Sequence, residues 1–216
     1  MDCIPVSDHA IVQATEALAA GGLVILPTDT VYGICADIRL DRAVRGIYNA
    51  KGKGPEAPLQ LLFGDRLDLV LEYAELTWGA ERLIEELGPG GWTIVTRARE
   101  GWDSPALAGG RTVGVRMPPV EAVRRVVESL GAPLAASSAN RHGDPSPTTC
   151  EAAVASVGKA CALALNAGPT SSGIDSTVVD CSAAEPRILR EGAIDRATIA
   201  RILGLRDIPV SRSVRQ

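Results

Sequence analysis

Short apolar runs alternate with amphipathic stretches along nearly the whole chain, and this alternation limits the possible folds more than any other feature. In residues 8–20 and 77–87 the apolar side chains recur at three- and four-residue intervals, as in helices with one buried face. Residues 23–26 and 59–63 are instead short and predominantly apolar, as in buried strands. The pattern predicts an α/β protein, and the short loop-linked strands near the C-terminus favour a mixed sheet over a purely parallel one.

The same periodicity gives the expected order of elements. Ser7 or Asp8 can cap the first helix, Asp41 begins the second, and Thr148 with Glu151 forms a capping box for the fifth. The expected helices cover residues 8–20, 41–51, 77–87, 120–130, 148–157 and 195–203, and the expected strands cover 23–26, 59–63, 93–96, 113–117, 133–137, 162–165, 177–180 and 187–189. We expect one domain over residues 1–204 and a tail over 205–216 that is loose from Asp207.

The composition describes a globular protein that is neither disordered nor embedded in a membrane. The 216 residues are 46% hydrophobic and 22% charged, with a net charge of -4, and no run approaches the roughly 18 apolar residues of a membrane span. The N-terminus lacks a basic segment followed by an apolar one, so we expect no secretory signal and a cytoplasmic protein. The five cysteines are widely spaced without a C-x-x-C pair, which predicts reduced thiols rather than disulfides or a zinc site.

Four loops rich in hydroxyl, amide and glycine residues are the expected location of a functional site. In open α/β sheets ligands bind outside strand ends, where such loops supply backbone N–H groups and short polar side chains. Two arginines within or at the end of apolar strands each need a buried carboxylate or an anionic ligand, because an unpaired charge removed from water costs several kcal/mol. The loops are 27–33, 51–58, 137–149 and 166–177, and the arginines are Arg116 and Arg190.

Ordinary catalytic motifs are weak in this chain. Cys35 could be a nucleophile, but no histidine lies near it in sequence, so a role as a small buried hydrophobic residue is favoured. His142 with Asp144 could form part of a triad, although both lie in a Gly/Pro-rich loop. No G-x-x-x-x-G-K-[ST] motif is present, and the run 88–91 is better explained by a helix C-cap and turn than by a phosphate cradle. Any chemistry would then depend on positioning and fixed positive charge.

Taken together and in order, these loops resemble the threonylcarbamoyl-AMP synthase family, also called the YrdC-type family, from about Ile11 to Ile194. The resemblance implies a twisted, open mixed sheet flanked by helices, in the single-domain form that lacks the C-terminal domain of longer relatives. The segments that carry it are Pro27-Thr-Asp-Thr-Val-Tyr-Gly33, Lys51-x-Lys53 through Pro58-Leu59, Pro89-Gly-Gly-Trp-Thr93, Val113-Gly-Val-Arg-Met-Pro118, Ser138-Ala-Asn140 with Ser146-Pro-Thr148, Asp175-Ser-Thr-Val-Val-Asp180 and Ile188-Leu-Arg-Glu-Gly192.

What the resemblance implies is a nucleotidyltransferase that condenses L-threonine, bicarbonate or CO2, and ATP into threonylcarbamoyl-AMP and pyrophosphate for tRNA modification. Mg²⁺ would accompany ATP, and a tRNA-modifying transferase would act downstream. Lys51, Lys53 and Arg116 would act through their charge, without an acid or base. Carried over by motif, the threonine pocket would comprise Thr30, Arg116, the backbone around Ala136, and Ser176; ATP would face Lys51, Lys53, Thr112, Ser138, Asn140, Ser146 and Arg190.

Three positions depart from the family pattern, which usually has Arg, then Lys or Asn, then Pro where this chain has Lys53, Ala57 and Gly91. Lysine cannot reproduce a bidentate guanidinium contact, so ATP affinity or the phosphate geometry is the property most affected. Singly, Thr30 and Ser176 could be turn formers, Ser146 a helix-start residue and the two lysines solvated surface charges.

Two other functions compete with the synthase. One is a domain that handles carbamoyl-adenylate, as in carbamoyltransferases, and the apparent threonine pocket counts against it. The other is an RNA-binding module, which the net charge of -4 and the scarcity of aromatic residues, with three Trp, three Tyr and one Phe, disfavour.

Overall fold

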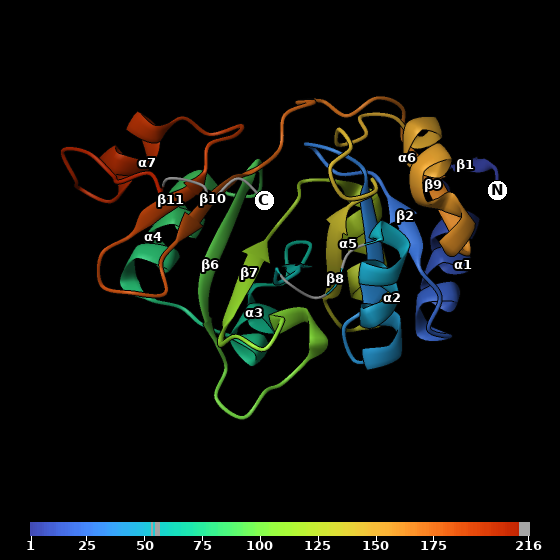
Figure 1. Ribbon diagram of the computed structural model, residues 1–216, viewed down its shortest axis with the longest axis horizontal. Helices are drawn as coiled ribbons and strands as arrows, with labels where there is room; N and C mark the ends of the chain where they lie inside the picture. Colours follow the sequence, from blue (N-terminus) through green and yellow to red (C-terminus); the bar gives the residue numbers. More distant parts are fainter. Residues whose placement is uncertain (53, 55–56, 212–216) are drawn as a thin grey trace.

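A computed structural model describes residues 1–52, 54 and 57–211 of the chain (Figure 1). Its strands form one sheet in the order β1-β9-β2-β3-β8-β4-β7-β6-β10-β11, with β5 paired to β6. The strands are β1 (Cys3–Pro5), β2 (Val24–Leu26), β3 (Gly33–Asp37), β4 (Gln60–Leu62), β5 (Ala74–Glu75), β6 (Trp92–Ala98), β7 (Thr112–Arg116), β8 (Leu134–Ser138), β9 (Leu163–Asn166), β10 (Thr177–Asp180) and β11 (Arg187–Arg190).

The sheet is mixed, as predicted. Strands β1 and β2 pair in parallel with β9, β4 with β7, and β6 with β10. Antiparallel pairs join β2 to β3, β3 to β8, β8 to β4, β7 to β6 and β10 to β11. The α/β class and the open mixed sheet flanked by helices are therefore confirmed.

Helices cover the two ends of the sheet differently. Figure 1 shows α1, α2, α5 and α6 gathered around β2, β3 and β8, whereas α4 and α7 lie beside β10 and β11. Helix α1 packs on α5, and α4 packs on α7. The helices are α1 (Asp8–Ala19), α2 (Asp41–Lys51), α3 (Leu67–Tyr73), α4 (Trp78–Leu87), α5 (Glu121–Leu130), α6 (Cys150–Val157) and α7 (Arg196–Ile202), with short 3-10 turns at Pro105–Leu107 and Gly158–Ala160.

Hydroxyl side chains fix where several helices begin. The Ser7 hydroxyl accepts a hydrogen bond from the Ala10 amide of α1, which decides between the two predicted caps. In α6 the cap is Thr149, whose hydroxyl accepts from the Ala152 amide. The predicted capping box at Thr148 is therefore wrong by one residue, because the chain turns into the helix one position later.

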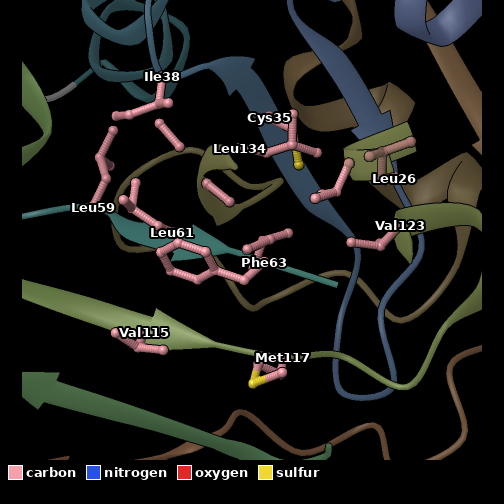
Figure 2. Close-up of a cluster of buried hydrophobic side chains, with 14 of the residues drawn as sticks. Leu26, Cys35, Ile38, Leu59, Leu61, Phe63, Val115, Met117, Val123 and Leu134 are labelled. Atoms are coloured by element: carbon pink, nitrogen blue, oxygen red, sulfur yellow. The ribbon is translucent and has the colours of Figure 1, made fainter. Parts of the chain in front are cut away.

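The main apolar core joins the middle of the sheet to its helices. Figure 2 shows Leu26 of β2, Cys35 of β3, Leu61 of β4, Val115 of β7 and Val123 of α5 converging in one cluster, and each is fully buried. Burying a side chain of this size contributes about 1.5–3 kcal/mol. Because side chains alternate along a strand, burying Val115 in this cluster turns the neighbouring residues of β7 toward the opposite face.

Four of the helices and strands named above were not predicted from the sequence: β1, β3, β5 and α3. The predicted loose tail is also wrong as far as Ser211. The Ile188 amide donates to the Pro209 carbonyl over 2.8 Å, the Ser211 amide donates to the Ile188 carbonyl over 2.8 Å, and Ile208 is fully buried. The tail thus adds to the edge of β11 through residue 211, while the boundary at residue 204 stays a prediction.

Candidate functional site

A cavity of about 260 Å³ lies on the face of the sheet opposite Val115, above the middle strands. The register of the paired strands places the residues of the cavity floor side by side. Gln60 of β4 lies beside Gly114 of β7 and Ala136 of β8, and Thr93 of β6 lies beside Val178 of β10. These strands come from distant parts of the chain, so the cavity exists only in the folded sheet. Its polar and charged lining residues are Gln60, Thr93, Arg116, Ser137, Ser138, Asp175, Ser176 and Arg190.

Arg116 ends β7 and places a buried guanidinium in the cavity wall. Its side chain is 3% exposed, and Nη2 donates to Asp29 Oδ1 over 2.8 Å, to Thr30 Oγ1 over 2.5 Å and to Thr28 Oγ1 over 3.2 Å. Burial lowers the pKa of Arg116, and the Asp29 carboxylate opposes that shift. The sequence left open whether a carboxylate or a ligand pairs with Arg116; the carboxylate is present, yet Nε has no partner among the described residues.

A chain of hydrogen bonds crosses the floor of the cavity through Ser176. Thr93 donates to the Gln60 side-chain oxygen over 2.8 Å, so its own oxygen accepts from the Ser176 hydroxyl, also over 2.8 Å. Arg190 Nη2 donates to the Ser176 hydroxyl over 3.0 Å, and Arg190 also holds the Ser176 carbonyl through Nε and Nη2. These hydrogen bonds fix the orientation of the Ser176 hydroxyl, and they hold the Arg190 guanidinium beside Ser176 in the cavity wall.

Lys51, at the end of α2, ties the loop after β8 to the rest of the domain. Its ammonium donates to the Ser138 carbonyl over 2.6 Å and to the Asn140 carbonyl over 2.8 Å. The Asn140 amide group in turn donates to the Arg141 and Asp144 carbonyls, which closes the loop on itself. In this arrangement Lys51 and Asn140 shape the loop that presents Ser138 to the cavity.

The predicted site residues converge in part. Arg116, Ala136, Ser138, Ser176 and Arg190 line the cavity, and buried Thr30 contacts it through Arg116. Ser146 reaches the wall through its hydroxyl, which donates to Asp175 Oδ2 over 3.2 Å. Thr112 instead lines a neighbouring cavity of about 880 Å³ further along β6 and β7. Lys53 lies outside the described residues.

Several polar residues of the site were not predicted, among them Asp29, Gln60, Thr93, Ser137 and Asp175. Asp29 stands inside the first motif and Asp175 begins the sixth, so motif position indicated both of them. Thr93 ends the third motif, whereas Gln60 gave no signal beyond being polar in an apolar strand. Their role depends on strand register, which the sequence does not reveal.

Close backbone packing explains one departure from the family pattern, Gly91, and the presence of glycine at position 192. A Cβ on Gly91 would lie 2.6 Å from the Ala193 Cβ, so the chain after β11 occupies the space that a larger residue would need. A Cβ on Gly192 would lie 2.2 Å from the Asp175 carbonyl oxygen. Gly91 therefore lets the segment after β11 pack against the segment before β6, and Gly192 lets it pack against the segment that carries Asp175 and Ser176.

The weaker catalytic alternatives lose support. Cys35 is fully buried in the apolar core and does not line the cavity, and burial strongly raises the pKa of its thiol, so it is a small hydrophobic residue. His142 is exposed, and within the described residues no hydrogen bond joins its ring to Asp144. The run 88–91 ends α4: Gly88 is its C-cap with φ 61°, and its carbonyl accepts from the Trp92 indole over 2.6 Å.

In the described part of the chain, no group of three or more His, Cys, Asp or Glu side chains is arranged to hold a metal ion. None of the helices in that part is both long enough and apolar enough to span a bilayer.

Sheet order and cavity lining together define an α/β domain with a polar cavity, lined by two arginines, on one sheet face. The family model for Sua5, YciO and YrdC proteins, described as telomere recombination, matches residues 16–192, and the chain belongs to that family. A Mycobacterium tuberculosis H37Rv protein named provisionally as a threonylcarbamoyl-AMP synthase is 38% identical over 199 residues, covering 91% of this chain and 90% of the relative.

Longer relatives share the same domain. The Bacillus subtilis threonylcarbamoyl-AMP synthase is 33% identical over 94% of this chain, which spans 59% of that relative. A structure of Pyrococcus abyssi Sua5 complexed with L-threonine has a TM-score of 0.91 at 30% identity, covering all of this chain and 66% of that protein. Escherichia coli YciO, with a TM-score of 0.80 at 24% identity over 89% of this chain and 94% of its own, shares the fold.

Proposed function

We propose that this protein is an L-threonylcarbamoyladenylate synthase, a nucleotidyltransferase that makes threonylcarbamoyl-AMP for tRNA modification. The observation that carries the proposal is the convergence of Arg116, Ser138, Ser176 and Arg190 on one cavity from separate strands and loops. Each had been assigned from a different motif to bind threonine or ATP. Relatives bearing the synthase name at 33–38% identity support the same activity.

The reaction needs two anions held together. The neutral amine of threonine adds CO2 with loss of a proton, or condenses with bicarbonate with loss of water, to give a carbamate. A carbamate oxygen then attacks the α-phosphorus of ATP, and the bond from that phosphorus to the oxygen bridging the β-phosphate breaks to release pyrophosphate. Like charges about 4 Å apart repel by roughly 4 kcal/mol at an effective dielectric near 20. The guanidinium groups of Arg116 and Arg190 would offset this repulsion, so positioning and fixed charge replace an acid or base.

Arg116 is the expected anchor for the threonine carboxylate. It is held by Asp29 and Thr30 before any ligand arrives, so little ordering would remain when threonine binds. Ser176, with its hydroxyl oriented by Thr93 and Arg190, is placed to contact the same molecule. Its backbone, with that of Ala136, completes the predicted threonine pocket.

ATP is larger than the 260 Å³ cavity can enclose together with threonine, since ligand pockets usually exceed about 300 Å³. We place the reacting phosphate near Arg190 and Ser138 and let the rest of the nucleotide extend along the sheet face toward Thr112, which lines the adjoining cavity. Mg²⁺ would arrive with ATP, held mainly by phosphate oxygens and water. A cytoplasmic location and a tRNA-modifying transferase that consumes the product complete the proposal.

The test is pyrophosphate release by the purified protein with ATP, Mg²⁺, bicarbonate and L-threonine. We expect release that stops when threonine is omitted and a product whose mass matches threonylcarbamoyl-AMP. Arg116→Ala should impair threonine use far more than Lys53→Arg, which restores the residue usual in the family and is expected to preserve or raise turnover. Release independent of threonine would favour the carbamoyl-adenylate alternative, and steeply salt-dependent RNA binding without ATP would favour the binding module.

A further inference from the structure

The cavity contains a carboxylate that the proposed chemistry does not yet use. Asp175, immediately before β10, is the acidic residue among the described lining residues, and it shares the wall with the cations Arg116 and Arg190. A carboxylate in a cleft that must hold carbamate and phosphate would repel both. A carboxylate in this position would instead attract a positively charged group of a bound ligand.

Contacts on several sides hold Asp175 in position. Its carbonyl accepts from the Ala193 amide over 3.0 Å, and Gly192 packs so closely that a Cβ there would meet that carbonyl oxygen at 2.2 Å. Its Oδ2 accepts from the Ser146 hydroxyl over 3.2 Å. Among the described residues no hydrogen bond reaches Oδ1, so this oxygen is available to a ligand.

The cations of the cavity are already engaged elsewhere. Arg116 makes its ion pair with Asp29, at 2.8 Å. Arg190 directs Nε and Nη2 to the Ser176 carbonyl and not to the neighbouring carboxylate. Within the described residues Asp175 therefore forms no ion pair, although it lies close enough to Arg116 for its charge to be felt there.

We propose that Asp175 binds the α-ammonium group of the amino-acid substrate and so makes the site select an amino acid over the corresponding hydroxy acid. This inference rests on the proposed function, because it takes threonine as the substrate. A zwitterion carries its carboxylate and its ammonium on one carbon, and the wall offers the matching pair of Arg116 and Asp175. With both ends held, the ammonium group points into the space beside Ser176 and Arg190. There it loses a proton to solvent, and the amine then adds CO2 with loss of a second proton, or condenses with bicarbonate with loss of water, to give the carbamate next to the nucleotide.

The experiment measures threonine binding by calorimetry, without ATP and without Mg²⁺, for the wild type, Asp175→Asn and Asp175→Glu. Asparagine keeps the shape and the Ser146 contact but removes the charge, so we expect the Kd for threonine to rise about tenfold or more. Asp175→Glu keeps the negative charge, so it should recover part of the threonine affinity that Asp175→Asn loses. Glu185→Gln, which removes an exposed carboxylate outside the cavity, is the matched control and should bind like the wild type.

A second ligand separates this role from a general effect on the pocket. 2,3-Dihydroxybutanoate has a hydroxyl in place of the amine, so its binding should be unchanged or tighter in Asp175→Asn. Equal losses for both ligands would overturn the proposal, as would unchanged threonine binding combined with a raised Mg²⁺ requirement in catalysis. If the wild type itself fails to bind threonine, the proposed function fails; if it binds and Asp175→Asn binds equally well, only the role of Asp175 fails.

Discussion

Replacing Arg116 with alanine should damage folding and threonine binding through two separable effects. The Asp29 side chain is 11% exposed and pairs with Arg116 at 2.8 Å, so the Ala variant leaves a buried carboxylate without its cation. Breaking a buried pair in this way costs about 3–5 kcal/mol, a large part of the 5–15 kcal/mol that stabilises a typical domain. Asp29→Asn removes the stranded charge, so the double variant should recover about 2 kcal/mol or more of the loss.

Threonine binding should not recover in the double variant. Loss of the guanidinium that pairs with the substrate carboxylate is expected to cost about 2–4 kcal/mol, which is roughly a 30- to 700-fold rise in Kd. Asp29→Asn alone keeps the guanidinium and removes a competing anion, so it should bind threonine at least as tightly as the wild type.

The wild type, the two single variants and the double variant form a double-mutant cycle. Urea unfolding of the four proteins gives the coupling energy between Arg116 and Asp29 for stability, and calorimetric titration gives their coupling energy for threonine binding. Both should be measured in the same buffer, because salt screens charge interactions. If the double variant regains threonine binding together with stability, Arg116 serves only to neutralise Asp29, and its assignment to the substrate is refuted.

Three further substitutions test contacts at the site and in the neighbouring sheet. Lys51→Ala should leave the carbonyls it holds unsatisfied, lowering stability by about 1–3 kcal/mol and raising the KM for ATP more than that for threonine in steady-state assays. Gly192→Ala forces a Cβ to within 2.2 Å of the Asp175 carbonyl oxygen and should cost about 2 kcal/mol or more in urea unfolding, whereas Gly90→Ala, with open space around it, should cost much less. Burial alone would raise the pKa of Asp180, but hydrogen bonds from Ser182 and Arg187 lower that pKa below its ordinary value. The carboxylate therefore contributes its full stabilisation above the unfolded-state pKa, and this contribution is lost as the pH falls through the folded-state pKa. The stability advantage of the wild type over Asp180→Asn, about 1–2 kcal/mol near neutral pH, should therefore disappear in strong acid.

Local periodicity was enough to predict the helices that bury one face. Helix α5 repeats buried valines at helical spacing, and α4 begins at a threonine cap, so both could be placed without tertiary information. Strand β3 could not be placed in this way. Its five residues, Gly33–Asp37, follow a polar loop directly, and they become a strand by pairing with β2 on one side and β8 on the other.

Motif order predicted which residues lie together better than it predicted their contacts. Arg116 and Ser176 were placed in one pocket from motifs 60 residues apart in the printed sequence, and they line one cavity. The pairing of Arg116 with Asp29 spans 87 residues and depends on which strands are neighbours. Lys51 is a second example: its side chain donates hydrogen bonds to loop carbonyls, and no local sequence pattern indicates those contacts.

The most direct measurement is a crystal structure of the protein with L-threonine and a non-hydrolysable ATP analogue. We predict that the threonine carboxylate binds Arg116, that its ammonium group binds Asp175, and that the α-phosphate lies beside Arg190 and Ser138 in the same cavity. Threonine and nucleotide bound at separate places, or threonine away from Arg116, would contradict the claim that this cavity brings the two substrates together.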